Sequence, residues 1–164
     1  LARVCDIQSS EPEFKINENQ CALEFDDGVY ITSCLTSGSF PDYEQIIPNE
    51  YSTHSTVLKN DLTHAFKKTN IFLNKFLQVS LYVTKDSITV SANSGEIGTT
   101  TESIKSQTSG DDLTLNFNQR YIAEALPHIV DDSIMLHFAG IGRPLVIEGV
   151  NDKSLRYLVM PMNK

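Results

Sequence analysis

The sequence predicts an α+β fold in which two helices cover one face of antiparallel sheet. Short segments of alternating polar and apolar residues, separated by turn-forming residues, indicate strands, and two segments with apolar residues near helical spacing indicate helices. From residue 51 the order is one strand, one helix and three strands, and this order then repeats when strand pairs are counted loosely. A repeated unit of this kind favours helices that are segregated to one side of a sheet.

Residues 13–35 predict three antiparallel strands, over 13–17, 20–25 and 29–35. Asp26-Asp27-Gly28 joins the last two strands, and Asp followed by Gly is a strong hairpin signal. Gly38 and Pro41 then break the pattern, because Gly permits unusual dihedral angles and Pro disfavours the helical region for the residue before it. We therefore expect a linker after the third strand, closed by Pro48.

The rest of the chain predicts two helices among further strands. The first helix is expected to run from Asn60, which would cap it, to Lys75. The second is expected to begin with Asn118 as its cap and to end before Pro127, which cannot continue a helix without losing a backbone hydrogen bond. Strands are expected over residues 51–58, 79–83, 87–92, 98–106, 113–117, 134–138, 144–149 and 155–160.

Composition and charge limit the class of protein. The 164 residues are 40% hydrophobic and 21% charged, which is typical of a globular domain. The 13 Lys and Arg against 21 Asp and Glu give a charge of -8, which opposes nonspecific attraction to DNA unless basic residues gather on one face. Cys5, Cys21 and Cys34 are odd in number and form no C-x-x-C pair, so they favour a reducing, cytoplasmic setting over a disulfide framework.

Neither a membrane span nor an export signal is expected. The longest apolar run, Tyr157 to Met162, is far shorter than the roughly 18 residues that indicate a membrane helix. The first residues lack a basic region followed by an apolar stretch. The chain also lacks an initiating Met, and we expect it to be a piece of a longer protein.

Enzyme motifs are weak in this sequence. The histidines at positions 54, 64, 128 and 137 form no H-x-x-x-H pair, so we expect no metal site. Gly140-Ile141-Gly142 lacks the further glycine of a dinucleotide-binding loop and is better interpreted as a turn. The pairs Asp111-Asp112 and Asp131-Asp132 could serve acid–base chemistry, but each is expected in a turn, where solvated carboxylates are common. A small acidic α+β hydrolase is the alternative hypothesis.

Three segments, taken in order, resemble one protein family. They are Ser39-Phe40-Pro41-Asp42-Tyr43 with Ile46-Ile47-Pro48, then residues 115–121 (Leu-Asn-Phe-Asn-Gln-Arg-Tyr), then residues 157–162 (Tyr-Leu-Val-Met-Pro-Met). The chain thereby resembles the bacterial DNA polymerase III beta subunit, the sliding clamp, over nearly its whole length. The resemblance implies the DNA clamp fold, with residues 1–46 as the end of the middle domain plus a linker and residues 47–164 as the third domain. In this family two subunits of three domains each form a ring around duplex DNA.

The resemblance also implies a function without catalysis or cofactor: a processivity factor, cytoplasmic, that binds double-stranded DNA without sequence specificity and forms a homodimer at full length. The DNA polymerase III catalytic subunit, the clamp loader and repair proteins would insert short linear motifs into an apolar pocket. Its matching residues here are Pro41, Gln45, Ile46, Phe76, Asn118, Tyr121, Pro144, Leu158, Val159, Met160, Pro161 and Met162. Gln45 departs from the basic residue often found there. Without the resemblance, Met160 and Met162 would be interpreted as core residues of a closing strand.

Two further surfaces follow from the resemblance. Lys67, Lys68, Lys75 and Arg120 would face DNA phosphates, although basic residues on a helix are also typical of a simple solvated face. The dimer interface would include Ile71, Phe72, Glu102 and Ile104, with burial in the core as the alternative for Ile71 and Phe72.

Overall fold

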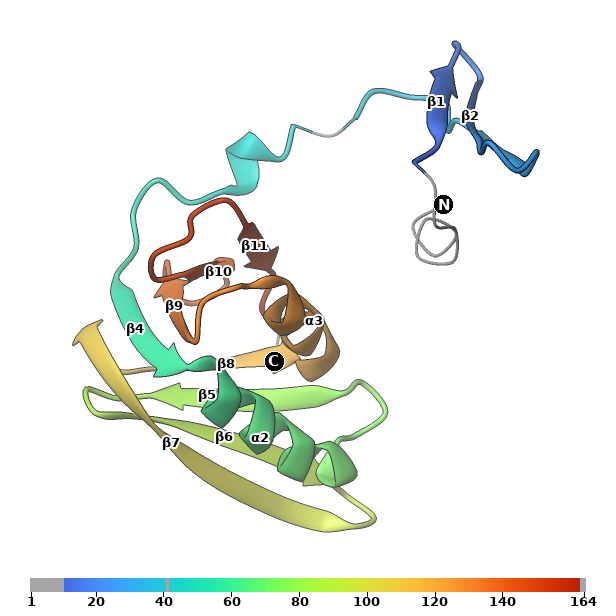
Figure 1. Ribbon diagram of the computed structural model, residues 1–164. Coiled ribbons are helices and arrows are strands. Elements are labelled where there is room, and N and C mark those ends of the chain that lie inside the picture. The colour runs from blue at the N-terminus through green and yellow to red at the C-terminus, as the bar shows by residue number, and fades with distance from the viewer. Residues whose placement is uncertain (1–10, 41, 163–164) are drawn as a thin grey trace. The chain divides into compact units, whose positions relative to one another are not determined.

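Residues 11–40 and 42–162 are described by a computed structural model, shown in Figure 1. The chain divides into two units between Asp42 and Tyr43, four residues before the expected domain boundary. Within the described part of the first unit, β1 (Glu13–Ile16), β2 (Gln20–Glu24) and β3 (Tyr30–Cys34) form an antiparallel sheet in that order. These three strands, and the hairpin turn at Gly28 with a φ of +85°, confirm the prediction for residues 13–35.

The second unit consists of two copies of one strand, one helix and three strands. A short 3-10 turn, η1 (Glu44–Ile46), precedes them. The first copy is β4 (Thr53–Leu58), α2 (Lys59–Thr69), η2 (Asn70–Phe72), β5 (Gln78–Val83), β6 (Ser87–Ser94) and β7 (Gly98–Gly110). The second is β8 (Leu113–Asn118), α3 (Gln119–Ala125), η3 (Leu126–His128), β9 (Ser133–Phe138), β10 (Leu145–Gly149) and β11 (Arg156–Val159). The repeated order matches the prediction.

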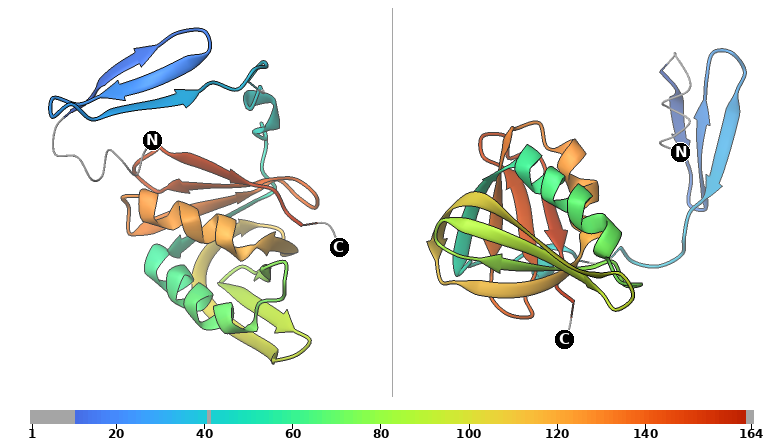
Figure 2. Two further views of the ribbon diagram at one scale, coloured as in Figure 1. Left: turned by 90° about the vertical axis from the view of Figure 1, so that its right-hand side faces the viewer. Right: turned by 90° about the horizontal axis from the view of Figure 1, so that it is seen from below.

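The two copies exchange partners within one sheet. Among the described residues the strand order is β11-β10-β9-β4-β7-β6-β5-β8, and every pairing is antiparallel. Strand β4 of the first copy therefore pairs with β9 of the second, and β8 of the second pairs with β5 of the first. Helices α2 and α3 lie side by side on one face of the sheet (Figure 2). Between helices and sheet lie Leu62, Phe66, Ile122 and Phe117, all buried in one core.

Several predicted boundaries were wrong, among them both ends of the first helix and the end of β7. Helix α2 begins at Lys59, so Asn60 lies inside its first turn. The Lys59 N–H donates to the Asp132 carbonyl at 2.8 Å, which satisfies a first-turn donor without a side-chain cap. The helix ends at Thr69, and Lys75 lies in the loop after η2. Strand β7 continues to Gly110 because its first part pairs with β6 and its second part with β4.

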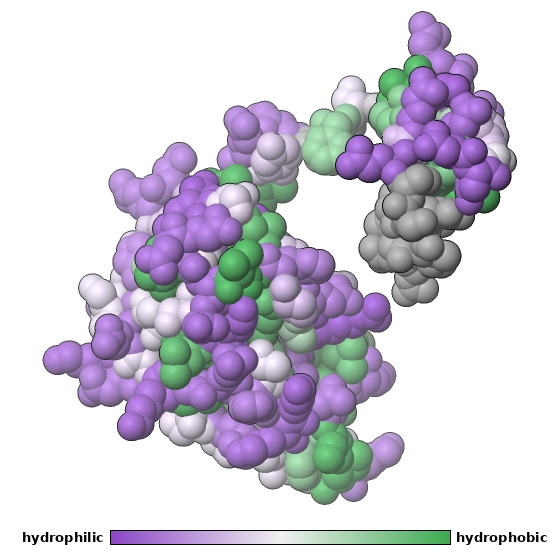
Figure 3. Space-filling model, viewed as in Figure 1, coloured by the Kyte–Doolittle hydropathy of each residue, from purple (hydrophilic) through white to green (hydrophobic). Residues whose placement is uncertain are grey.

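The face seen in Figure 3 is mostly polar, with apolar side chains exposed in separate patches. None of the helices in the described part of the chain is long and apolar enough to cross a membrane.

Candidate functional site

The segment after β11 lies at the surface beside β8. Val159 packs in the core, whereas the next residue, Met160, is more than half exposed. Successive side chains of an extended segment point to opposite sides, which explains the difference. The Met162 N–H donates to the Asn116 carbonyl of β8 at 2.7 Å and so holds this segment against the far end of the sheet. Met160 is thus not a core residue, and Leu158, Pro161 and Met162 are half-buried.

The junction of β8 and α3 is organised by Asn118. Its Oδ1 accepts a hydrogen bond from the Arg120 N–H at 3.0 Å, so the predicted helix cap is confirmed. Its Nδ2 donates to the Phe76 carbonyl at 3.1 Å. Asn118 therefore joins the first turn of α3, which carries exposed Tyr121, to the loop that carries exposed Phe76.

The loop before β5 presents the Phe76 ring to solvent. Asn74 Oδ1 accepts hydrogen bonds from the N–H groups of Phe76 at 2.9 Å and Gln78 at 3.2 Å. Leu77 has a φ of +55°, a left-handed conformation that costs a residue with a Cβ roughly 1–2 kcal/mol. Strain of this kind is found where the surrounding contacts impose it, often at binding sites. Leu77 directly follows the exposed Phe76.

A cleft of about 640 Å³ separates η1 from β11 and the turn before it. Ile46 and Leu158, two of the expected pocket residues, line it together. Lys153 and Arg156 contribute cationic side chains to the same cleft. The cleft therefore combines apolar and charged lining residues.

The turn that carries Lys153 is fixed by a carboxylate. Asp131 Oδ2 accepts hydrogen bonds from the N–H groups of Asn151 at 2.6 Å and Asp152 at 2.9 Å. The N–H groups of Asp152 and Asn151 hold the pKa of Asp131 below its ordinary value because they stabilise the charged form.

Two other expected pocket residues occupy different environments. Pro144 is buried directly before β10, and Gln45 is exposed on η1. Pro41 lies outside the described residues.

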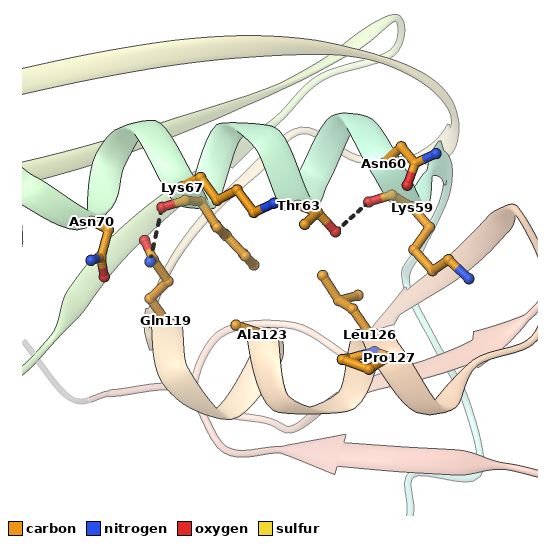
Figure 4. Close-up of a pocket in the computed structure, with 10 residues that line it drawn as sticks. Lys59, Asn60, Thr63, Lys67, Asn70, Gln119, Ala123, Leu126 and Pro127 are labelled. Carbon is orange, nitrogen blue, oxygen red and sulfur yellow. Dashed lines mark hydrogen bonds between the residues drawn. The ribbon is translucent and has the colours of Figure 1, made fainter.

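A groove of about 490 Å³ runs between α2 and α3 (Figure 4). Its apolar lining comes from Phe66, Ala123, Leu126 and Pro127, and Lys59 and Lys67 contribute the positive charges. Lys59, Thr63 and Lys67 follow one another at intervals of four residues along α2, which places them on one face of the helix. That spacing was visible in the sequence, but Lys59 was not among the residues expected to face DNA.

The four expected DNA-facing residues are not equivalent. Lys67 lines the groove. Lys68 Nζ forms an ion pair with Glu102 at 2.9 Å, and Arg120 Nε with Glu124 at 2.7 Å. The fourth, Lys75, lies over the Phe76 ring, 5.0 Å from its centroid.

The expected dimer surface centres on η2 and β7. Ile71 is exposed and Phe72 half-buried, so burial in the core does not account for Ile71. Ile104 is only 8% exposed and packs in the core, so its side chain is not available to a partner.

The edge of β7 offers backbone groups instead. Residues 98–105 pair with β6 on one side and with no described strand on the other. The Ser106 and Thr108 N–H groups donate to carbonyls of the β5–β6 turn. Because backbone groups alternate in direction along a strand, the N–H groups of Thr101 and Ser103 point to the open edge.

Comparison with solved structures defines the class of fold. A DNA polymerase sliding clamp from Pseudomonas aeruginosa matches with a TM-score of 0.87 and 22% identity, over 99% of this chain and 44% of that chain. The sliding clamp from Bacillus subtilis matches with a TM-score of 0.83 and 27% identity, over 93% of this chain and 41% of that chain. The fold is therefore that of a sliding clamp.

The family follows from the sequence match. The family model for the DNA polymerase III beta subunit, C-terminal domain, matches residues 44–163, and the chain belongs to this family. The beta sliding clamp of Escherichia coli K12 is 28% identical over 163 residues, which cover 99% of this chain and 44% of that protein. The beta sliding clamp of Synechococcus elongatus is 25% identical with the same coverage. The chain thus spans less than half the length of these relatives, and the hydrolase alternative finds no support among them.

Proposed function

We propose that this chain is the C-terminal part of a sliding clamp, a non-catalytic processivity factor that keeps DNA polymerase III on double-stranded DNA in the cytoplasm. The observation that carries the proposal is the family match over residues 44–163, together with the clamp fold of the same residues. In the assembled protein two copies would close a ring around DNA, and the ring would slide because it contacts phosphates rather than bases. Residues 1–46 would belong to the middle domain and its linker.

The peptide-binding surface would lie where the C-terminal segment meets β8 and α3. Support comes from three exposed apolar side chains, those of Phe76, Tyr121 and Met160, on elements tied together by the hydrogen bonds of Asn118 and Met162. The cleft lined by Ile46 and Leu158 would extend this surface along β11. Apolar anchors in such pockets supply most of the affinity for a short peptide. The polymerase catalytic subunit, the clamp loader and repair proteins would compete for it.

The DNA-facing surface would be the side of the sheet covered by α2 and α3. Lys67 and Lys59 in the groove supply positive charge to it, whereas Lys68 and Arg120 are each paired with a carboxylate. The open edge of β7 with Ile71 would form the contact to the second subunit, since unpaired N–H and C=O groups of an edge strand favour addition of another strand.

The peptide-binding proposal is tested by fluorescence anisotropy with the 164-residue chain and a labelled peptide that carries a clamp-binding motif. Met160→Ala is expected to weaken binding about tenfold, because truncation of an apolar anchor at a peptide pocket costs more than about 1 kcal/mol. Val130→Ala is the control, because Val130 is an exposed apolar residue in the loop before β9. This loop lies at the opposite end of the strands from Met160. Equal affinity of Met160→Ala and wild type would refute the placement of the pocket.

A further inference from the structure

Two histidines face each other where the two repeats of the second unit join. His54 on β4 and His137 on β9 are partners in the strand register, although 83 positions separate them in the sequence. Their Nδ1 atoms are 2.7 Å apart, and the rings meet edge to face. Tyr51 packs against both rings. His54 is exposed, whereas His137 is 8% exposed.

The other nitrogen of His137 binds a buried carboxylate. His137 Nε2 lies 3.0 Å from Glu148 Oε1, and Glu148 on β10 is itself buried. Lys153 Nζ donates to the same oxygen at 2.7 Å, and Arg156 Nε lies 3.7 Å from Oε2. Burial opposes ionisation of Glu148, but the hydrogen bonds from Lys153 and His137 outweigh it and lower its pKa. Glu148 is therefore a charged acceptor.

The remaining ionisable groups near the pair are few. Lys85 and Asp86, in the β5–β6 turn, line the same hollow as His54. Among residues 11–40 and 42–162, no group of three or more His, Cys, Asp or Glu side chains is arranged to hold a metal ion. A separation of 2.7 Å between two ring nitrogens is a hydrogen-bond distance, so one proton lies between them.

The hydrogen-bond geometry restricts how many protons the pair can hold. A carboxylate only accepts, so His137 Nε2 carries hydrogen and, in the neutral ring, its Nδ1 is bare. His54 Nδ1 must then be the donor. A first added proton can occupy Nε2 of exposed His54 with this hydrogen bond intact. A second would place N–H groups on both facing nitrogens and set two cations against each other.

We propose that His54 and His137 form a pH-sensitive latch across the β4–β9 junction, which accepts one extra proton and is opened by the second. Strand β4 is the strand of the first repeat that pairs with β9 of the second. Opening the latch therefore weakens the contact between β4 and β9. Burial lowers the pKa of His137, although the hydrogen bond and the charge of Glu148 act in the opposite direction. The lowered pKa agrees with a pair that does not readily bind a second proton.

The latch predicts the pH dependence of stability. The unfolded chain binds two protons at these positions below a pH of about 6.5, whereas the folded chain binds one. The unfolding equilibrium constant should therefore rise up to about tenfold for each pH unit below that value, over the range in which the folded pair holds one extra proton.

The test is urea unfolding of the full chain between about pH 5.5 and 7.5. His54→Gln should lower the number of protons taken up on unfolding by about one, because the amide oxygen can accept a hydrogen bond from protonated His137. His64→Gln, on the exposed side of α2, is the matched control and should leave the dependence unchanged. An unchanged dependence in His54→Gln would overturn the proposal.

A second measurement needs no variant. Nitrogen-15 NMR of the wild-type chain should find the neutral Nδ1–H tautomer at His54 and the Nε2–H tautomer at His137 near neutral pH. On acidification only one of the two rings should become cationic while the fold persists. If both rings become cationic while the chain remains folded, the latch does not exist.

Discussion

Gln119 is predicted to set the spacing of the two helices, and its replacement by alanine tests this directly. The side chain is 5% exposed at the start of α3. Its Nε2 donates to the Phe66 carbonyl at 3.1 Å, and its Oε1 accepts from the Thr69 hydroxyl at 2.8 Å. Both partners lie at the end of α2, so one side chain joins the two helices that form the groove.

The cost of Gln119→Ala can be estimated from these contacts. Each hydrogen bond contributes about 1 kcal/mol, because neither partner is left unsatisfied: the Thr69 hydroxyl can donate to the Ala65 carbonyl instead, and the Phe66 carbonyl still accepts from the Asn70 N–H. The lost methylene packing adds about 1 kcal/mol. The free energy of unfolding should fall by about 3 kcal/mol, and the melting temperature by roughly 10 °C for a domain of this size.

Urea unfolding of the second unit, followed by circular dichroism, measures this difference. Gln107→Ala is the control, because Gln107 is an exposed glutamine on β7. Combination with Thr69→Val should show a coupling energy of at least about 0.5 kcal/mol, as expected for residues in one hydrogen-bond network. A loss below about 1 kcal/mol in Gln119→Ala, or additive effects in the double variant, would refute this role.

Two further predictions concern a backbone position and the DNA-facing surface. Gly110→Ala should lower the free energy of unfolding by more than about 3 kcal/mol in urea unfolding, because φ is +111° and a Cβ would overlap the Ser52 carbonyl. Gly98→Ala is the control: φ is +126° there, but a Cβ would meet open space, so the loss should be only about 1–2 kcal/mol. Equal losses in the two variants would show that the overlap at Gly110 adds nothing. Lys67→Gln should remove about one phosphate contact, so the slope of log binding constant against log salt concentration for duplex DNA should change by about 0.9. Lys85→Gln, on the β5–β6 turn, should leave this slope unchanged. The reverse result would mean that DNA does not lie against the face covered by α2 and α3.

Local sequence signals predicted most elements of this fold. The Asp26-Asp27-Gly28 turn, the cap at Asn118 and the order of strands and helices all depend on residues that are neighbours in the chain. The start of α2 was missed because its first N–H binds the carbonyl of Asp132, a contact that no local pattern encodes. The ordered pairing of β4 with β9 and of β8 with β5 is non-local in the same way.

The candidate site was predictable only in part, because exposure depends on packing. The resemblance implied that both Val159 and Met160 belong to the pocket. In the structure Val159 is buried and Met160 is exposed, because the two residues fall on opposite sides of an extended segment. Ile104 was expected at an interface and instead packs in the core. The pairing of His54 with His137 has no signature in the sequence, since strand register alone brings the two rings together.

The most direct test of the peptide-binding surface uses methionine methyl groups. The sequence has three methionines, Met135, Met160 and Met162, so a chain labelled with carbon-13 at these methyls gives three signals. Met135 lies on β9 in the hollow that contains His54, away from the C-terminal segment, and serves as an internal control. Addition of a clamp-binding peptide should shift the Met160 and Met162 signals and leave Met135 in place. A shift confined to Met135, or no shift of any signal at saturating peptide, would contradict the proposed site.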